Sequence, residues 1–343
     1  MPARDRSVVV RVRWVLGLAL VVALIGGAAA FMTAMPGRSY RGALPPLRAA
    51  EAACSQRLRA DIAALSVTIG ERRVGLGRSL RAAADLLFLR LEAIQRLAEP
   101  GRARLRRERL AQNNADNLVL DLAGRSTGPL VLIGAHYDSA PGTPGANDNA
   151  SGVALALELA AHFAAQPTQH PLRFVLFANE EPPFFDSGTM GSDTHAARAR
   201  ARGERIRLML SLETLGYYSD APGSQRYPWP LSLVYPDRGN FVGFVANLGS
   251  AGELRDVVRT FRAHAQFPSE AAALPEALPG VSWSDHASFW RRGYAAIMVT
   301  DTAPFRYPFY HTPKDELARL DVQRLARVAT GLRAVIERLA AAP

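Results

Sequence analysis

The sequence predicts an α/β fold in which helices cover both faces of a central mixed, largely parallel β-sheet, preceded by an N-terminal transmembrane helix. Three observations support this prediction. Nearly continuous apolar runs alternate with segments of helical periodicity, as in a parallel sheet covered on both faces. Histidine and acidic residues follow several of these runs, where the ends of neighbouring strands meet. One uncharged apolar stretch near the N-terminus is long enough to cross a membrane.

The apolar stretch, residues 14–35, follows a basic flank, residues 1–13, that contains Arg4, Arg6, Arg11 and Arg13. At a rise of about 1.5 Å per residue it can span a hydrocarbon core of about 30 Å, so we expect a signal anchor with its basic flank in the cytoplasm. A cleaved signal peptide, with a site near residues 28–30, and a buried core helix are the alternatives. We expect a linker at 36–47 and one globular domain at 48–343.

The domain begins with two segments of helical spacing, 48–65 and 79–98, before the pattern changes to alternating strands and helices. Strands 117–122 and 130–135 are expected to be adjacent, because only a short turn-prone segment separates them. A proline-rich and tyrosine-rich stretch, 217–229, is expected to form a long active-site loop. The remaining expected elements are helices at 151–165, 252–265 and 318–340, and strands at 172–178, 208–212, 231–235 and 295–300.

The charge of the chain does not indicate a nucleic-acid partner. The formal net charge is +10, but the arginines are dispersed along the chain and no recognition motif accompanies them. Lys314 is the only lysine among 41 basic residues, so a bias toward arginine explains the charge. The single cysteine, Cys54, cannot form an intrachain disulfide and is expected to be an inert, partly buried thiol.

Two segments near the middle of the chain carry residues that bind divalent cations. His136 directly follows an apolar run, and Asp138 can accept its second ring N–H and so fix the tautomer. Asp148 lies in a glycine-flanked segment just before a helix, where its two oxygens can bridge two cations. A helix N-cap is the alternative role for Asp148.

Three further segments extend this set. Glu180 and Glu181 follow an apolar run, and adjacent carboxylates at a strand end repel each other unless a cation or proton compensates. Glu213 follows another apolar run, and His311 lies in a proline-bounded loop. Histidine and carboxylate ligands suit zinc, so the combined set predicts a metallohydrolase with two zinc ions per chain.

The order and spacing of these motifs resemble metallopeptidase family twenty-eight. This family of zinc exopeptidases includes bacterial leucyl aminopeptidases and glutamate carboxypeptidase II, with the glutaminyl cyclases as relatives. The resemblance spans roughly residues 60–340. The segments that carry it are Gly134-Ala-His136-Tyr-Asp138-Ser139, Gly145-Ala-Asn147-Asp148-Asn149, Asn179-Glu180-Glu181-Pro182, Ser211-Leu-Glu213 and Tyr310-His311.

The resemblance implies a role for each of these residues. His136 and Glu213 would bind one zinc, Glu181 and His311 the other, and Asp148 both. Glu180 would be the general acid and base, and Asp138 would orient His136. The family more often has Asp at the position of Glu213. Three further residues are expected to contact the substrate or support the ligands: Asp285, His286 and Tyr310, with helix capping as the alternative for the segment Ser284–His286.

The expected function is that of a zinc-dependent exopeptidase, in first place an aminopeptidase, in which a water between two zinc ions attacks the peptide bond with Glu180 as base. Its substrates would be peptides, met in the periplasm or outside the cell, and no obligate protein partner is implied. Two alternatives stay open: a glutaminyl cyclase-like aminoacyltransferase with one zinc, and a catalytically inactive ectodomain that binds a partner. Dipeptidase or carboxypeptidase action, the side-chain preference and the oligomeric state are not determined.

Overall fold

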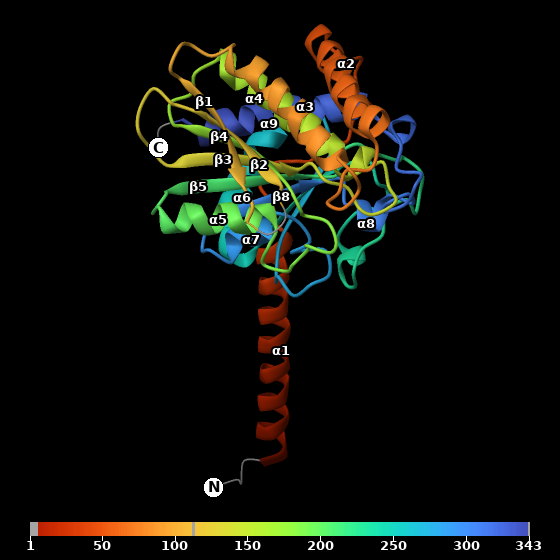
Figure 1. Cartoon of the computed structure of the whole chain (residues 1–343). Coiled ribbons are helices and arrows are strands. Elements are labelled where there is room, and N and C mark those ends of the chain that lie inside the picture. Colours follow the sequence, from red (N-terminus) through yellow and green to blue (C-terminus); the bar gives the residue numbers. More distant parts are fainter. Residues whose placement is uncertain (1–5, 112–113, 342–343) are drawn as a thin grey trace.

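A computed structural model describes residues 6–111 and 114–341 of the chain. Helix α1 (Arg6–Thr33) leaves the body of the molecule as a single column, and the rest of the described chain forms one layered domain (Figure 1). Within α1, the segment Leu16–Thr33 is apolar and long enough to cross a membrane, and none of it is buried. Of the predicted basic flank, Arg4 lies outside the described residues.

The core of the domain is a mixed sheet of eight strands in the described part of the chain, in the order β1-β2-β4-β3-β5-β8-β6-β7. The central strands β4, β3, β5 and β8 run parallel, as do β6 and β7, whereas the β1–β2, β2–β4 and β6–β8 pairs are antiparallel. The strands are β1 (Ala103–Arg109), β2 (Asp116–Leu122), β3 (Leu130–His136), β4 (Leu172–Phe177), β5 (Ile206–Glu213), β6 (Val242–Asn247), β7 (Ser269–Leu274) and β8 (Ala296–Thr300).

Helices cover both faces of this sheet, which confirms the predicted fold class. One face packs against α3 (Ser79–Gln95), α4 (Gly152–Ala165), α6 (Ala251–His264) and α9 (Val322–Leu339), with α2 (Ala49–Ala63) over α4 and α9. The other face packs against α5 (Gly191–Ala201) and α7 (His286–Trp290). Helix α8 (Ala303–Arg306) is a short turn after β8. Because both faces are covered, β4 and β8 are buried along their whole length.

Two details of the predicted sheet are wrong. Strands β2 and β3 are not adjacent, because β4 lies between them and pairs with both. The predicted strand at 231–235 is instead a short helical turn, Leu231–Leu233, followed by exposed residues. Leu231 and Tyr235 still pack against the core, whereas Leu233 and Val234 are exposed.

The elements that the prediction omitted include β1, β6, β7 and α5. Strand β1 (ARLRRER) is an edge strand with mostly charged residues, and α5 (GSDTHAARARA) carries few large apolar side chains. Strand β7 (SEAAAL) is dominated by alanine, which favours strands little. Each of these elements is held by its neighbours rather than by its own pattern.

Candidate metal centre and active site

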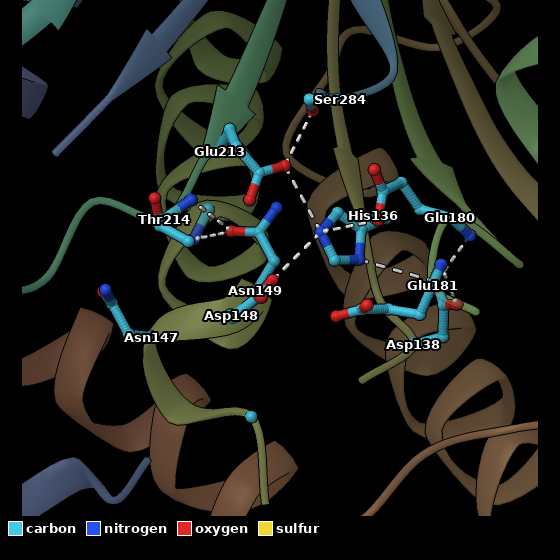
Figure 2. Close-up of polar contacts among 12 residues, drawn as sticks. His136, Asp138, Asn147, Asp148, Asn149, Glu180, Glu181, Glu213, Thr214 and Ser284 are labelled. Atoms are coloured by element: carbon cyan, nitrogen blue, oxygen red, sulfur yellow. Dashed lines mark hydrogen bonds and ion pairs between the residues drawn. The ribbon is translucent and has the colours of Figure 1, made fainter. Parts of the chain in front are cut away.

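The sheet brings the carboxyl ends of three parallel strands to one edge, and four of the predicted site residues lie at or just after these ends: His136, Glu180, Glu181 and Glu213 (Figure 2). His136 is the last residue of β3 and Glu213 the last residue of β5. Glu180 and Glu181 follow the end of β4. Ligands collect at this edge in α/β sheets, because the strand ends and the following loops form an open crevice.

Asp148 stands between two histidines that are far apart in the sequence. It lies in the irregular turn Ala146–Ser151, just before α4, and its peptide bond to Asn149 is cis. Its Oδ1 is 3.2 Å from Nε2 of His136, and its Oδ2 is 2.9 Å from Nε2 of His311. The two oxygens of one carboxylate thus face two separate groups of ligands.

The spacing of the donor atoms fits zinc. Ligand atoms about 2.0 Å from a tetrahedral zinc lie about 3.3 Å from each other. Nε2 of His136 is 3.3 Å from Oε2 of Glu213, and Nε2 of His311 is 3.4 Å from Oε2 of Glu181. Among the described residues, three groups each have one ligand atom per residue within 4.8 Å of the others: His136–Asp148–Glu213, Asp148–Glu181–His311 and His136–Glu180–Glu181. Glu180 is more distant, with Oε2 3.8 Å from Nε2 of His136.

The hydrogen-bonding state of these atoms also fits a cation site. Among the described residues, both ring nitrogens of His136, Oδ1 of Asp148 and Oε1 of Glu181 are buried without a partner in hydrogen-bond geometry. Buried polar atoms rarely lack a partner unless a water or ion satisfies them. The residues present therefore match a cation-binding centre.

Burial and mutual repulsion shift the pKa values of the cluster. Burial raises the pKa of Glu180 well above the usual glutamate value, although His136 opposes the rise. Burial and the Asp148 carboxylate raise the pKa of Glu181 to about 8. Burial alone would lower the pKa of His136, but Glu180 and Glu213 raise it well above its usual value. Without a cation, bound protons must compensate the charge of the buried carboxylates, and a bound cation would take the place of these protons.

Asp138 holds the segment that carries the two glutamates. Its carboxylate accepts the backbone N–H of Glu180 at 3.2 Å and of Glu181 at 3.0 Å, and its Oδ1 lies 3.5 Å from Nδ1 of His136 (Figure 2). One buried side chain therefore positions three of the predicted site residues.

The sequence did not single out two residues that hold the metal-binding loop from behind. Asp315 accepts the backbone N–H groups of Asn147 at 2.8 Å and Asp148 at 3.1 Å. Arg72 is fully buried and donates to the carbonyl oxygens of Tyr137 at 2.8 Å and Gly145 at 2.9 Å. Neither has a local signal, because each acts on a segment more than 60 residues away.

Ser284 supports Glu213 directly. Its hydroxyl donates to Oε2 of Glu213 at 2.7 Å and lies 3.1 Å from the hydroxyl of Ser211 (Figure 2). The segment Ser284–His286 was predicted to lie near the site, but the contact comes from its serine rather than from the two residues chosen.

The three supporting residues of the prediction have different surroundings. Asp285 is fully buried, and burial raises its pKa to about 7. His286 is also fully buried, with Nε2 2.7 Å from the carbonyl oxygen of Val281 and its ring against Trp290. Tyr310 stacks on His311 with ring centroids 3.9 Å apart. His286 therefore packs inside the domain, whereas Tyr310 lies at the metal-binding groups.

An apolar cavity opens beside Glu213 and Tyr310. Its walls come from the loop 225–235, from β6 and β7, and from the segment after β8. The loop predicted at 217–229 thus contributes Gln225 and Tyr227 to the lining. The apolar side chains of the lining include Leu231, Tyr235, Phe241, Phe244, Val281, Trp283, Met298 and Phe305.

A mixed sheet covered on both faces, with histidines and carboxylates at the carboxyl ends of its central strands, gives this chain an aminopeptidase-like fold, and its match to a peptidase family makes it a zinc metallopeptidase. The profile of Peptidase family M28 matches residues 117–336, and the chain belongs to this family. The family resemblance of the motifs is thereby confirmed.

Two relatives illustrate the similarity in sequence. The chain is 43% identical to the Escherichia coli protein YfbL over 63% of this chain and 68% of YfbL. It is 25% identical to the aminopeptidase YwaD of Bacillus subtilis over 57% of this chain and 38% of YwaD. The chain therefore spans well under half the length of that aminopeptidase.

Solved structures with this fold include two kinds of enzyme. The LapA aminopeptidase of Legionella pneumophila matches with a TM-score of 0.66 at 17% identity, over 89% of this chain and 75% of LapA. The glutaminyl cyclase of Tannerella forsythia matches with a TM-score of 0.61 at 19% identity, over 82% of this chain and 98% of the cyclase. At these identities the likeness shows the fold alone.

Proposed function

We propose that this chain is an aminopeptidase that binds two zinc ions, is anchored by α1 and acts outside the cytoplasm. In this proposal His136 and Glu213 bind one ion, Glu181 and His311 bind the other, and Asp148 binds both. Glu180 is the general base and acid. The observation that carries the proposal is the position of Asp148, whose two oxygens lie 3.2 Å and 2.9 Å from histidines of different ligand groups.

Zinc bound by these residues would polarise the scissile carbonyl and make a water acidic enough to attack near neutral pH. Glu180 is 6% exposed, and its Oε2 lies close to the ligand groups without the short ligand spacing. From there it accepts the proton of the attacking water and later donates it to the departing amine.

Aminopeptidase action is favoured over glutaminyl cyclase action by the two ligand groups. A cyclase-like enzyme with one zinc has no use for a second set of ligands, and here both sets share Asp148. The name of the relative YwaD also supports an aminopeptidase. Cyclase activity stays the second candidate, because a solved cyclase shares the fold.

The anchoring part of the proposal rests on α1. Residues 34–48 connect its apolar segment Leu16–Thr33 to α2 of the domain, and basic residues precede it. Positive flanks stay in the cytoplasm, so the domain would lie on the opposite side of the membrane.

The experiment that tests the proposal compares Glu180→Gln with Asp148→Ala. Glu180→Gln should lower turnover about 10²- to 10⁴-fold and leave bound zinc unchanged. Asp148→Ala should lower the zinc content measured by atomic emission. Retained activity in Glu180→Gln would exclude it as the base, and unchanged zinc in Asp148→Ala would contradict its role as a shared ligand.

The substrate class is tested with the wild-type protein. Free aminoacyl peptides should be cleaved and N-terminally blocked peptides should not. Cyclisation of an N-terminal glutamine, with one zinc per chain, would instead support the cyclase.

A further inference from the structure

The loop beside the active-site cavity exposes an unusual group of large apolar side chains. In the segment Pro228–Tyr235, which we call the apolar loop, Trp229 is 80%, Leu233 78% and Val234 58% exposed. Single exposed apolar residues are ordinary, but a cluster of this size on one short loop marks an interaction surface. The sequence pattern that suggested a buried strand here is therefore accounted for by a surface contact.

The apolar loop is held in a defined position. The hydroxyl of Tyr227 donates to the carbonyl oxygen of Pro236 at 2.7 Å, which closes the base of the loop. The hydroxyl of Tyr235 donates to the carbonyl oxygen of Ala271 in β7 at 2.7 Å. Trp229, Leu233 and Val234 thus face solvent while the base of the loop is closed and Tyr235 is fixed to the sheet.

The loop lies where α1 enters the domain. A surface hollow is lined by Thr33 and Met35 at the end of α1 and by Val234 and Tyr235 of the loop. Met32 packs against the same apolar cluster as Leu231. In Figure 1, α1 extends away from this side of the body, so a membrane around α1 would face the loop.

The end of α1 is joined firmly to the domain through α6. Arg262 donates from Nη1 to the carbonyl oxygens of Pro36 at 3.2 Å and Gly37 at 3.3 Å. Arg255 lies over the ring of Phe31, with its guanidinium carbon 4.6 Å from the ring centroid. These contacts set the position of the loop relative to the membrane-crossing segment.

Charge and side-chain type match the surface of a bilayer. Arg38 and Arg41 are exposed and line the hollow with Arg262, where anionic lipid headgroups would meet them. Tryptophan is favoured at the boundary between headgroups and hydrocarbon, because its ring is amphipathic. Trp229 would lie at this boundary.

The active-site cavity opens beside the same surface. Tyr227, Leu231 and Tyr235 of the loop region line the cavity together with Glu213. The cavity and the hollow at the end of α1 share Tyr235, Glu270 and Ala271. The cavity therefore lies directly beside the hollow at the end of α1.

We propose that the apolar loop inserts Trp229, Leu233 and Val234 into the surface of the bilayer that α1 crosses, and that the substrates are peptides whose N-terminus is presented at that surface. The inference rests on the proposed function, because it assumes that α1 spans the membrane and that the cavity receives a peptide. It adds a second membrane contact and a location for the substrate.

The contact is tested with a fluorescent label on the full-length protein in vesicles of equimolar phosphatidylethanolamine and phosphatidylglycerol. The variants Leu233→Cys and Leu89→Cys each carry the environment-sensitive dye NBD. Leu89 is the matched control, because it is a 62% exposed leucine on α3, which covers the opposite face of the sheet. Cys54 should not react, because it is buried and burial raises the pKa of its thiol to about 12.

The label at position 233 should shift its emission to shorter wavelength and be quenched severalfold more by nitroxide lipids than the label at 89. Equal emission spectra and equal quenching of the labels at positions 233 and 89 would overturn the proposed contact between the apolar loop and the bilayer. A second measurement avoids the cysteine variants: brominated lipid should quench the wild type more than Trp229→Phe, and equal quenching would also count against the contact.

The substrate location is tested with the same peptide in two forms, one free in solution and one attached to a lipid in the vesicles. Leu233→Asp should lower cleavage of the lipid-attached peptide severalfold and leave cleavage of the free peptide unchanged, whereas Leu89→Asp should change neither. If Leu233→Asp cleaves the lipid-attached peptide as fast as the wild type does, the inferred location of the substrate is overturned. If the wild type cleaves neither peptide, the proposed function fails, and the label experiment still decides the membrane contact.

Discussion

Asp315 offers the sharpest test of how the domain holds its metal-binding loop. Oδ1 accepts the N–H of Asn147 at 2.8 Å, and Oδ2 accepts the N–H of Asp148 at 3.1 Å. The hydroxyl of Tyr307 also donates to Oδ1, at 3.0 Å. In Asp315→Asn the shape is kept, but the amide nitrogen replaces one oxygen. One of the two N–H groups must then face a donor and lose its acceptor.

The expected loss of zinc affinity follows from this one lost hydrogen bond. A hydrogen bond to a charged acceptor contributes about 1.5–3 kcal/mol, and about 1.4 kcal/mol corresponds to a factor of ten. If the lost bond displaces the Asp148 carboxylate, zinc should bind about 10- to 150-fold more weakly. Removing a side chain that hydrogen-bonds to a metal-binding segment typically lowers metal affinity about 10- to 100-fold, which agrees with this range.

The assay is competition for zinc against a chromophoric chelator, with thermal unfolding in excess chelator as a separate measure of folding. Tyr307→Phe is the matched control, because it removes a neutral donor to Asp315 and leaves both N–H bonds intact. It should weaken zinc binding by less than tenfold. Wild-type zinc affinity in Asp315→Asn would refute the reasoning, since the carboxylate would then not position Asp148.

Three further predictions concern other parts of the domain. Ser284→Ala removes the hydroxyl that donates to the Glu213 carboxylate at 2.7 Å, so zinc affinity should fall about 10- to 150-fold while the thermal midpoint in chelator stays close to wild type; an unchanged affinity would contradict this support. Burial alone would raise the pKa of Glu158, but the bidentate bonds from Arg57 at 2.8 Å lower it in the folded protein. The ion pair therefore stabilises the fold above the unfolded pKa of about 4.3, and this stabilisation is lost as pH falls through the lower, folded pKa. Urea unfolding of Glu158→Gln should therefore depend less on pH in this acidic range than unfolding of the wild type, and parallel profiles would exclude the ion pair as a cause. Ile133→Ala, at a fully buried side chain of β3, should lower the free energy of unfolding by about 2–5 kcal/mol, and a loss below 1 kcal/mol would show that the core closes over the cavity.

Local patterns predicted the parts of this domain whose signal lies within a few residues. The apolar runs at 130–135 and 172–178 correspond to the buried strands β3 and β4, and His136 at the end of β3 lies at the edge where ligands gather. The predicted strand at 231–235 is wrong because its local pattern is misleading. Its apolar side chains have the composition of a core strand, and composition alone does not distinguish burial in a core from contact with another surface.

Contacts between distant segments carried no such signal. Asp315 lies 167 residues from the N–H of Asp148 that it accepts, and Ser284 lies 71 residues from Glu213. Strand β4 separates β2 from β3, although β3 follows β2 directly in the sequence. Register and strand order depend on which surfaces pack together, and a single sequence does not record them.

The sequence by itself determined the chemistry that this protein can perform. The types of side chain in its motifs suit zinc and proton transfer, and its N-terminal segment suits a membrane, because both depend on the properties of individual residues and short runs. The tertiary structure decided which of these residues meet. It brought the two oxygens of Asp148 to two histidines and placed the active-site cavity beside the end of α1, because only folding converts separation along the chain into distances of a few ångströms.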